Sequence, residues 1–269
     1  MTINELEPKE VWGYFHEITQ IPRPSKKEEK IRAYLLDFAR KNNLEAKQDR
    51  AGNVLITKPA VPGKEHVPTV ILQAHMDMVC EKNNDVVHDF DTDPIETVID
   101  GDWVRAKGTT LGADNGMGIA AALAVLASKD IAHGKIEALF TVDEETGLTG
   151  ANLLEDNFLT GNILLNLDTE EEGQIYIGCA GGKNTVARFT WKPKPAPEGY
   201  FWFKVQVKGL RGGHSGSDID KGLGNANKIL TRFLYAFLDE KYKPALVEIG
   251  GGNLHNAIPR EAYAIAGVK

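Results

Sequence analysis

Val70-Ile71-Leu72-Gln73-Ala74-His75-Met76-Asp77 is an apolar run that ends in a histidine and a carboxylate. The run predicts a buried strand, and since alternate side chains of a strand share a face, we expect His75 and Asp77 to point the same way. A neutral imidazole binds a metal through one nitrogen, and a carboxylate on the other nitrogen fixes its orientation. An isolated pair of this kind is more often a plain strand end, so the prediction of a metal ligand depends on other residues.

Two further runs also end in acidic residues. Ile136–Val142 leads into Asp143-Glu144-Glu145, and Ile163–Leu167 leads into Asp168. Open α/β sheets place ligand sites beyond the carboxyl ends of their strands. We therefore expect these carboxylates to converge near His75.

A glycine-rich segment, 108–118, precedes an alanine-rich helical run over 119–127. Such loops bind phosphate at helix N-termini. This one lacks the GxxxxGK[ST] pattern, and the carboxylate of Asp114 at its centre would repel phosphate. A plain tight turn is one interpretation. The better one is that the glycines let the backbone approach closely, so that Asp114 faces a cation.

Length and charge limit the function classes. The 269 residues suffice for one large domain or two smaller ones, and the formal net charge of −7 argues against nucleic acid or an anionic membrane as the main partner. Two cysteines provide no disulfide framework, and neither a signal-peptide pattern nor a membrane span is evident, so we predict a cytoplasmic protein. Near the N-terminus, Ser25 and Glu28 have the spacing of a capping box and predict a helix start.

The candidate ligands form a set of one imidazole and several carboxylates. Mixed nitrogen and oxygen ligands suit Zn²⁺, with Mn²⁺ or Co²⁺ as substitutes, and a shared carboxylate would hold two ions ~3.5 to 4 Å apart. Two adjacent glutamates do not easily serve one ion, so one is expected to ligate while its neighbour acts as general base. The set is His75, Asp114, Glu144, Glu145 and Asp168.

Five motifs carry a family resemblance: AHMDMV (74–79), GTTLGADNGMG (108–118), FTVDEETGLTGA (140–151), LLNLDTEEEG (164–173) and IYIGCAGG (175–182). They resemble the M20 metallopeptidases, most closely the bacterial aminoacyl-histidine dipeptidases of that family. The resemblance implies an α/β fold, with a mixed sheet flanked by helices and a smaller α/β lid domain. It also implies a homodimer that hydrolyses small dipeptides, of the Xaa-His (carnosine-like) kind, with two Zn²⁺ ions.

The resemblance also implies roles for single residues. Asp77 would orient the histidine ligand, the bridging carboxylate would be followed by a cis peptide bond (114–115), and Glu144 would be the general base. The implied metal ligands are His75 and Asp168 on one zinc, Glu145 on the other, and Asp114 between them.

The sequence changes character beyond the last motif, where the Pro-rich segment 192–197 precedes an alternating strand, 201–208. We predict a catalytic domain over 1–185 and a lid and dimerisation domain over 186–269. By itself His214 reads as a surface turn residue. Its GGHSG setting resembles the lid histidine that steadies the oxyanion, in many members from the partner subunit, and Asn256 in NAIP resembles the lid asparagine that holds substrate.

Family members continue beyond the lid to a late histidine that completes the zinc site of Glu145, whereas this sequence stops at Lys269. The resemblance therefore predicts a fragment, truncated at the C-terminus, whose Glu145 site binds its ion weakly. Two other functions stay open: an N-acyl amino acid deacylase of the same chemistry, and a non-catalytic fragment.

Overall fold

The computed structural model describes residues 2–83, 85–169, 171, 173–179, 185–237 and 242–269. Contacts divide the chain into two compact units, Met1–Gly181 and Gly182–Lys269. Residues 180–184, where the last family motif ends and the predicted boundary begins, lie outside the described part. Each unit has its own sheet and its own apolar core.

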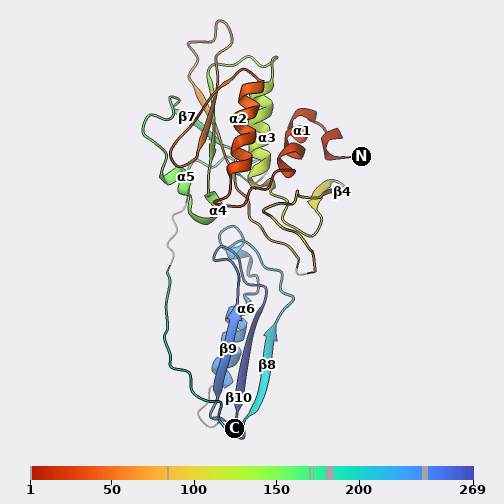
Figure 1. Ribbon diagram of the computed structural model, residues 1–269, viewed down its shortest axis with the longest axis vertical. Coiled ribbons are helices and arrows are strands. Elements are labelled where there is room, and N and C mark those ends of the chain that lie inside the picture. Colours follow the sequence, from red (N-terminus) through yellow and green to blue (C-terminus); the bar gives the residue numbers. More distant parts are fainter. Residues whose placement is uncertain (1, 84, 170, 172, 180–184, 238–241) are drawn as a thin grey trace. The chain divides into compact units, whose positions relative to one another are not determined.

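The first unit is built on a mixed five-stranded sheet (Figure 1). Strand β2 runs antiparallel to both of its neighbours, β1 and β6, whereas β6, β3 and β7 are mutually parallel. The predicted strands over 136–142, 163–167 and 70–77 are thereby confirmed, as is the mixed sheet. In spatial order the strands are β1 (Glu45–Gln48), β2 (Val54–Lys58), β6 (Ile136–Thr141), β3 (Val70–His75) and β7 (Ile163–Asn166).

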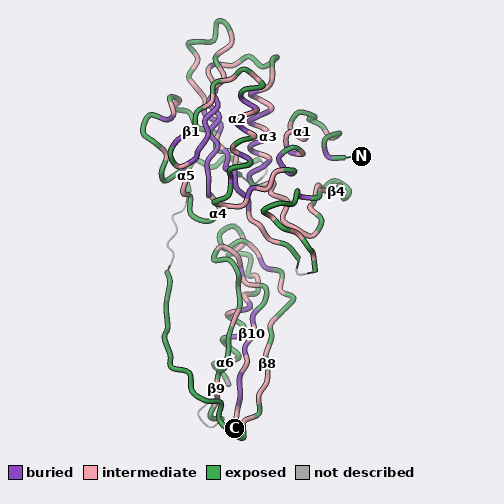
Figure 2. The backbone as a smooth tube through the Cα atoms, in the orientation of Figure 1, coloured by how far each residue is buried: buried purple, intermediate pink, exposed green. Residues whose placement is uncertain are grey.

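The core of the first unit lies mainly between this sheet and three helices, α1 (Lys9–Thr19), α2 (Glu29–Lys41) and α3 (Ala113–Ala127). Strand alternation separates the two faces of the sheet. On β6, Ala138 and Phe140 pack in the helix-side core, while Leu139 packs with Phe158 in a smaller cluster. Figure 2 shows the buried residues of this unit gathered on its sheet and helices.

Short elements complete the first unit. A two-stranded hairpin pairs β4 with β5, and two short helices follow β6. Their bounds are η1 (Ile3–Glu5), β4 (Thr97–Asp100), β5 (Trp103–Ala106), α4 (Glu144–Gly147) and α5 (Thr149–Asn152). No helix in the described part of the chain has both the length and the apolar character needed to cross a lipid bilayer.

The capping box predicted at Ser25 and Glu28 is wrong. Helix α2 begins at Glu29, and Ser25 does not cap it. The Ser25 hydroxyl donates instead to Asp77 Oδ2 at 2.7 Å, and Glu28 Oε1 accepts the backbone N–H of Asp143 at 2.9 Å. Partners that are distant in sequence have displaced the local bonds that the spacing suggested.

The second unit is a three-stranded antiparallel sheet in the order β8 (Phe201–Val207), β10 (Ala262–Val268) and β9 (Ala245–Gly251). Helix α6 (Ala226–Phe237) packs on β8 and β10, and η2 (Ile219–Lys221) precedes it. Val205 and Val207 of β8 join the small core around Leu230, as the predicted alternation requires. In the second unit, β10 carries the largest share of the buried residues (Figure 2), and Ala226 and Leu230 of α6 and Ile258 are also buried.

Candidate metal centre

Strand order decides which side chains meet in the first unit. Strand β3 lies between β6 and β7 and is parallel to both, so the carboxyl ends of all three are at one sheet edge. His75 ends β3 opposite Thr141 of β6, and the Leu167 N–H donates to the Gln73 carbonyl at 2.9 Å. The residues that follow each strand, His75 to Asp77, Asp143 to Glu145 and Asp168, are thereby gathered at one edge.

Asp114 reaches this edge from the start of α3. The backbone at Asp114 and Asn115 is not helical, and the peptide bond between them is cis, as the family resemblance implied. Gly112, which caps the helix, has a φ of +69°, a left-handed conformation that glycine adopts without steric cost. The glycine-rich segment therefore turns sharply at the point where it delivers the Asp114 carboxylate.

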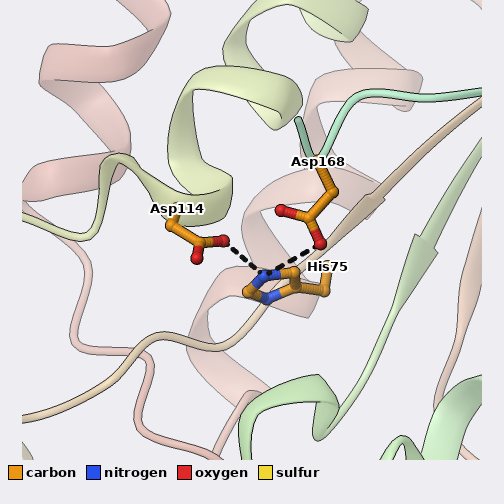
Figure 3. Close-up of side chains that lie close together, drawn as sticks. All are labelled: His75, Asp114 and Asp168. Carbon is orange, nitrogen blue, oxygen red and sulfur yellow. Dashed lines mark hydrogen bonds and ion pairs between the residues drawn. The ribbon is translucent and has the colours of Figure 1, made fainter. Parts of the chain in front are cut away.

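Three of the predicted ligands face one another in the close-up of Figure 3. His75 Nε2 lies 2.8 Å from Asp114 Oδ1 and 3.8 Å from Asp168 Oδ2. Ligand atoms of these three residues all lie within 4.8 Å of one another, as do those of a second group, His75, Glu144 and Glu145. In the described part of the chain, Glu145 is thus grouped with Glu144 rather than with Asp114.

Asp77 is fully buried beneath this cluster and accepts hydrogen bonds on both oxygens. Its Oδ1 lies 3.2 Å from His75 Nδ1 and accepts the Glu144 N–H at 3.0 Å, while Oδ2 accepts the Glu145 N–H at 3.1 Å. The Ser25 hydroxyl is a further donor to Oδ2. One carboxylate therefore ties the end of β3 to the start of α4.

The pKa values of the cluster record an excess of negative charge. Burial raises the pKa of Asp77, but its bonds to His75, Ser25 and the Glu144 N–H outweigh burial and lower it to about 2. Burial and the neighbouring Asp114 charge raise the pKa of Glu145, and separately that of Asp168, to about 7. Burial lowers the pKa of His75, but bonds to Asp114 and Asp77 raise it to about 10.

The raised pKa values of Glu145, Asp168 and His75 have a common origin, because carboxylates crowded in a poorly solvated site disfavour one another's ionised forms and favour positive charge nearby. A divalent cation at His75 Nε2 would supply that charge in place of a proton. The donor set of one imidazole nitrogen and several carboxylate oxygens suits Zn²⁺ and related ions. The residues present therefore fit a metal.

His214 and Asn256 lie together in the second unit. His214 forms an isolated antiparallel β-bridge with Ala257, and the Ser215 N–H donates to the Asn256 carbonyl at 2.9 Å. The exposed imidazole accepts the N–H groups of Gly216 and Ser217 on Nδ1, each at 3.2 Å. An Nδ1 that accepts carries no proton, so the neutral ring presents Nε2–H as a donor.

Reasoning from sequence missed two residues that support the cluster, Arg23 and Ser25. The Pro22-Arg23-Pro24 segment indicates a helix break, which is correct, because the segment lies between α1 and α2. Nothing in that pattern shows that the Arg23 side chain is buried, with 2% of its surface exposed, against loops more than fifty residues away. Only the folded chain reveals this.

Residues 71–216, more than half of the chain, match the sequence profile of Peptidase family M20/M25/M40, and residues 198–269 match that of a peptidase dimerisation domain. The chain is 49% identical to the cytosol non-specific dipeptidase of Escherichia coli K12 over 266 residues, which cover 99% of the chain and 55% of that relative.

Two solved structures are similar over nearly the whole chain. Aminoacylhistidine dipeptidase from Vibrio alginolyticus has a TM-score of 0.67 at 48% identity, covering 100% of this chain and 55% of that one. Aminopeptidase PepT from Bacillus cereus has a TM-score of 0.55 at 24% identity, covering 98% and 66%, and shares the fold. The chain thus spans about half the length of the Escherichia coli and Vibrio alginolyticus relatives.

Proposed function

The chain belongs to Peptidase family M20/M25/M40, and we propose on this premise that it is the metal-binding part of a dipeptidase. The family resemblance drawn from the motifs is confirmed. One observation carries the proposal: His75, Asp114 and Asp168 bring ligand atoms within 4.8 Å of one another, with Glu144 and Glu145 beside His75. Dipeptides ending in histidine are the proposed substrates, since the similar Vibrio alginolyticus structure is an aminoacylhistidine dipeptidase.

The proposed cofactor is a pair of zinc ions, with Co²⁺ or Mn²⁺ as substitutes. His75, Asp114 and Asp168 would hold one ion, and Asp114 and Glu145 would contribute to the second. When bound, the ions supply an acidified water and a polarised peptide carbonyl. Asp77 orients His75 by accepting the proton of its Nδ1, which leaves Nε2 to face the ion.

Glu144 is the proposed general base. It takes a proton from the attacking water, whose oxygen bonds to the carbonyl carbon, and it returns that proton to the amine nitrogen as the C–N bond breaks. The backbone N–H of Glu144 is fixed on Asp77 Oδ1, so the base is attached to the carboxylate that orients His75. Base and ligand are therefore positioned by one buried group.

The second unit has the proposed role of a lid and dimerisation domain, and residues 1–185 that of the catalytic domain. His214 would donate its Nε2–H to the developing oxyanion, and Asn256 would hold substrate. The donor tautomer of His214 and the dimerisation-domain match over 198–269 support these roles. The same match supports a homodimer, and the proposed location is the cytoplasm, since the similar Escherichia coli relative is a cytosol dipeptidase.

Hydrolysis assays test the proposal. The zinc-loaded chain is incubated with Xaa-His dipeptides, other dipeptides and N-acyl amino acids. We expect dipeptide cleavage, with Xaa-His preferred, and a loss of about 10²- to 10⁴-fold in kcat for Glu144→Gln with metal binding retained. Exclusive cleavage of N-acyl amino acids would replace the dipeptidase by a deacylase. Normal turnover by Glu144→Gln would refute the assignment of the base.

A further inference from the structure

Arg23 is buried next to the candidate metal centre. Its guanidinium donates from Nη1 to the carbonyl oxygens of Met76, at 3.0 Å, and Asp77, at 2.7 Å, and from Nη2 to the carbonyl of Gly112. Among the described residues, no carboxylate lies within ion-pair distance of it. A buried guanidinium bound only to carbonyls loses most of its hydration, so something else must stabilise its charge.

The three carbonyls belong to the two segments that present metal ligands. Met76 and Asp77 directly follow His75, and Gly112 lies two residues before Asp114. The distance of 2.8 Å between His75 Nε2 and Asp114 Oδ1 depends on how these segments are placed against each other. The planar guanidinium, with donors in a fixed fork, clamps one segment to the other.

Two glycines make room for this clamp. A Cβ atom at Gly112 would lie 2.6 Å from Arg23 Nη2, and one at Gly116 would lie 2.9 Å from the same atom. The glycines were expected to let the backbone approach closely so that Asp114 faces a cation, and the group that the backbone approaches at Gly112 is the guanidinium of Arg23.

The charge of Arg23 matches its surroundings. Burial lowers the pKa of Arg23 to about 10, while Asp77, Asp114 and Glu145 act in the opposite direction, so the side chain stays charged at neutral pH. When all five site carboxylates are ionised and His75 is neutral, as metal binding requires, the carboxylates and Arg23 together carry a net charge that two divalent cations would neutralise. The carboxylates are Asp77, Asp114, Glu144, Glu145 and Asp168.

We propose that Arg23 is a positioning residue of the metal centre, which holds the His75 and Asp114 segments in register and sets the affinity for divalent cations. This inference rests on the metal site of the proposed function. It predicts that the charge and the shape of the Arg23 side chain contribute separately to this affinity. Lysine keeps the charge but lacks the planar fork that spans three carbonyls.

The test compares Arg23→Gln and Arg23→Lys in the full chain loaded with Co²⁺. Affinity is measured by calorimetric titration, ligand geometry by the visible absorption of Co²⁺, and stability by urea unfolding of the metal-free protein. We expect affinity to fall by about 10- to 100-fold in Arg23→Gln, as for other residues that orient metal ligands. The affinity of Arg23→Lys for Co²⁺ should fall less, but its Co²⁺ absorption spectrum should still differ from that of the wild type. Arg40→Gln, at an exposed arginine of α2, is the matched control.

A second variant covers the case in which Arg23→Gln does not fold. Gly116→Ala retains Arg23 but places a methyl group 2.9 Å from its guanidinium and 3.0 Å from the ring of Phe15. Unchanged Co²⁺ affinity and spectrum in folded Arg23→Lys and Gly116→Ala would overturn the inference. If the wild-type chain bound no divalent cation, the proposed function would fail instead, so the two failures are distinguishable.

Discussion

The two units hold their candidate functional side chains by different means. In the first, His75, Asp114 and Asp168 come from three segments separated by dozens of residues. They lie next to the buried carboxylate of Asp77 and the buried guanidinium of Arg23. In the second, His214 is held by backbone N–H groups two and three residues away, in an exposed loop. The first arrangement depends on the whole fold of its unit, whereas the second depends on a few local bonds.

The largest expected effects on the free energy of unfolding come from truncating core side chains. These variants test whether the two units unfold independently. Phe140 is fully buried in the large core, and Leu230 is 1% exposed in the small one. Phe140→Ala should cost about 3–5 kcal/mol and Leu230→Ala about 2–5 kcal/mol. In calorimetry we expect two transitions, each variant lowering the midpoint of its own unit. A single transition that both variants shift equally would remove the distinction.

Lowering the pH should reduce the stability of the first unit specifically, because Glu137 on β6 becomes protonated. Burial raises the pKa of Glu137, but bonds from Thr160 and Lys135 outweigh burial and lower it to about 2. A folded pKa below the ordinary value means that the stabilisation is present above pH ~4.5 and is lost as the pH falls towards 2. The effect is on the order of 3 kcal/mol.

The measurement is the midpoint of each transition between pH 7 and 3 in metal-free protein. Glu137→Gln should reduce the acid sensitivity of the first transition and leave the second unchanged. Equal acid sensitivity in wild type and variant would show that other groups dominate.

Removing the carboxylate of Asp114 should disable the site of the first unit and leave that of the second intact. Asp114→Asn keeps the size of the side chain but removes the charge that lies 2.8 Å from His75 Nε2. Affinity for Zn²⁺ or Co²⁺ should fall by about 100-fold, or about 2.7 kcal/mol, in calorimetric titration. Asp130→Asn, at an exposed position beyond α3, is the control. Wild-type affinity in Asp114→Asn would exclude it as a ligand.

The smallest effect is expected at the His214 loop. Asp218 Oδ2 accepts the His214 N–H at 2.7 Å, and Asp218 Oδ1 pairs with Lys221 at 2.7 Å. Asp218→Ala should cost about 1 kcal/mol in the second transition and allow His214 to populate both tautomers. Nitrogen-15 NMR of the ring reports the tautomer, and Asp220→Ala is the neighbouring control. A wild-type ring that carries its proton on Nδ1 would contradict the donor role.

Sequence patterns predicted the strands that carry the site because all three are apolar runs, the exposed edge strand β7 as well as the largely buried β3 and β6, and because polar residues at their ends stand out. The acidic residues after β6 and β7 were therefore identified with no knowledge of strand order. The capping box failed because Ser25 and Glu28 found partners 52 and 115 residues away, which outweighed the local bonds.

The sequence by itself determined which residue types are available and which strand ends carry them, because periodicity and local chemistry are properties of short segments. Only the tertiary structure decided that β3 lies between β6 and β7, that Glu145 is grouped with Glu144 at His75, and that Arg23 is buried between two ligand-bearing loops. Those outcomes depend on the pairing and packing of segments that are distant in sequence. A local sequence pattern gives no information on the free energies of such long-range contacts.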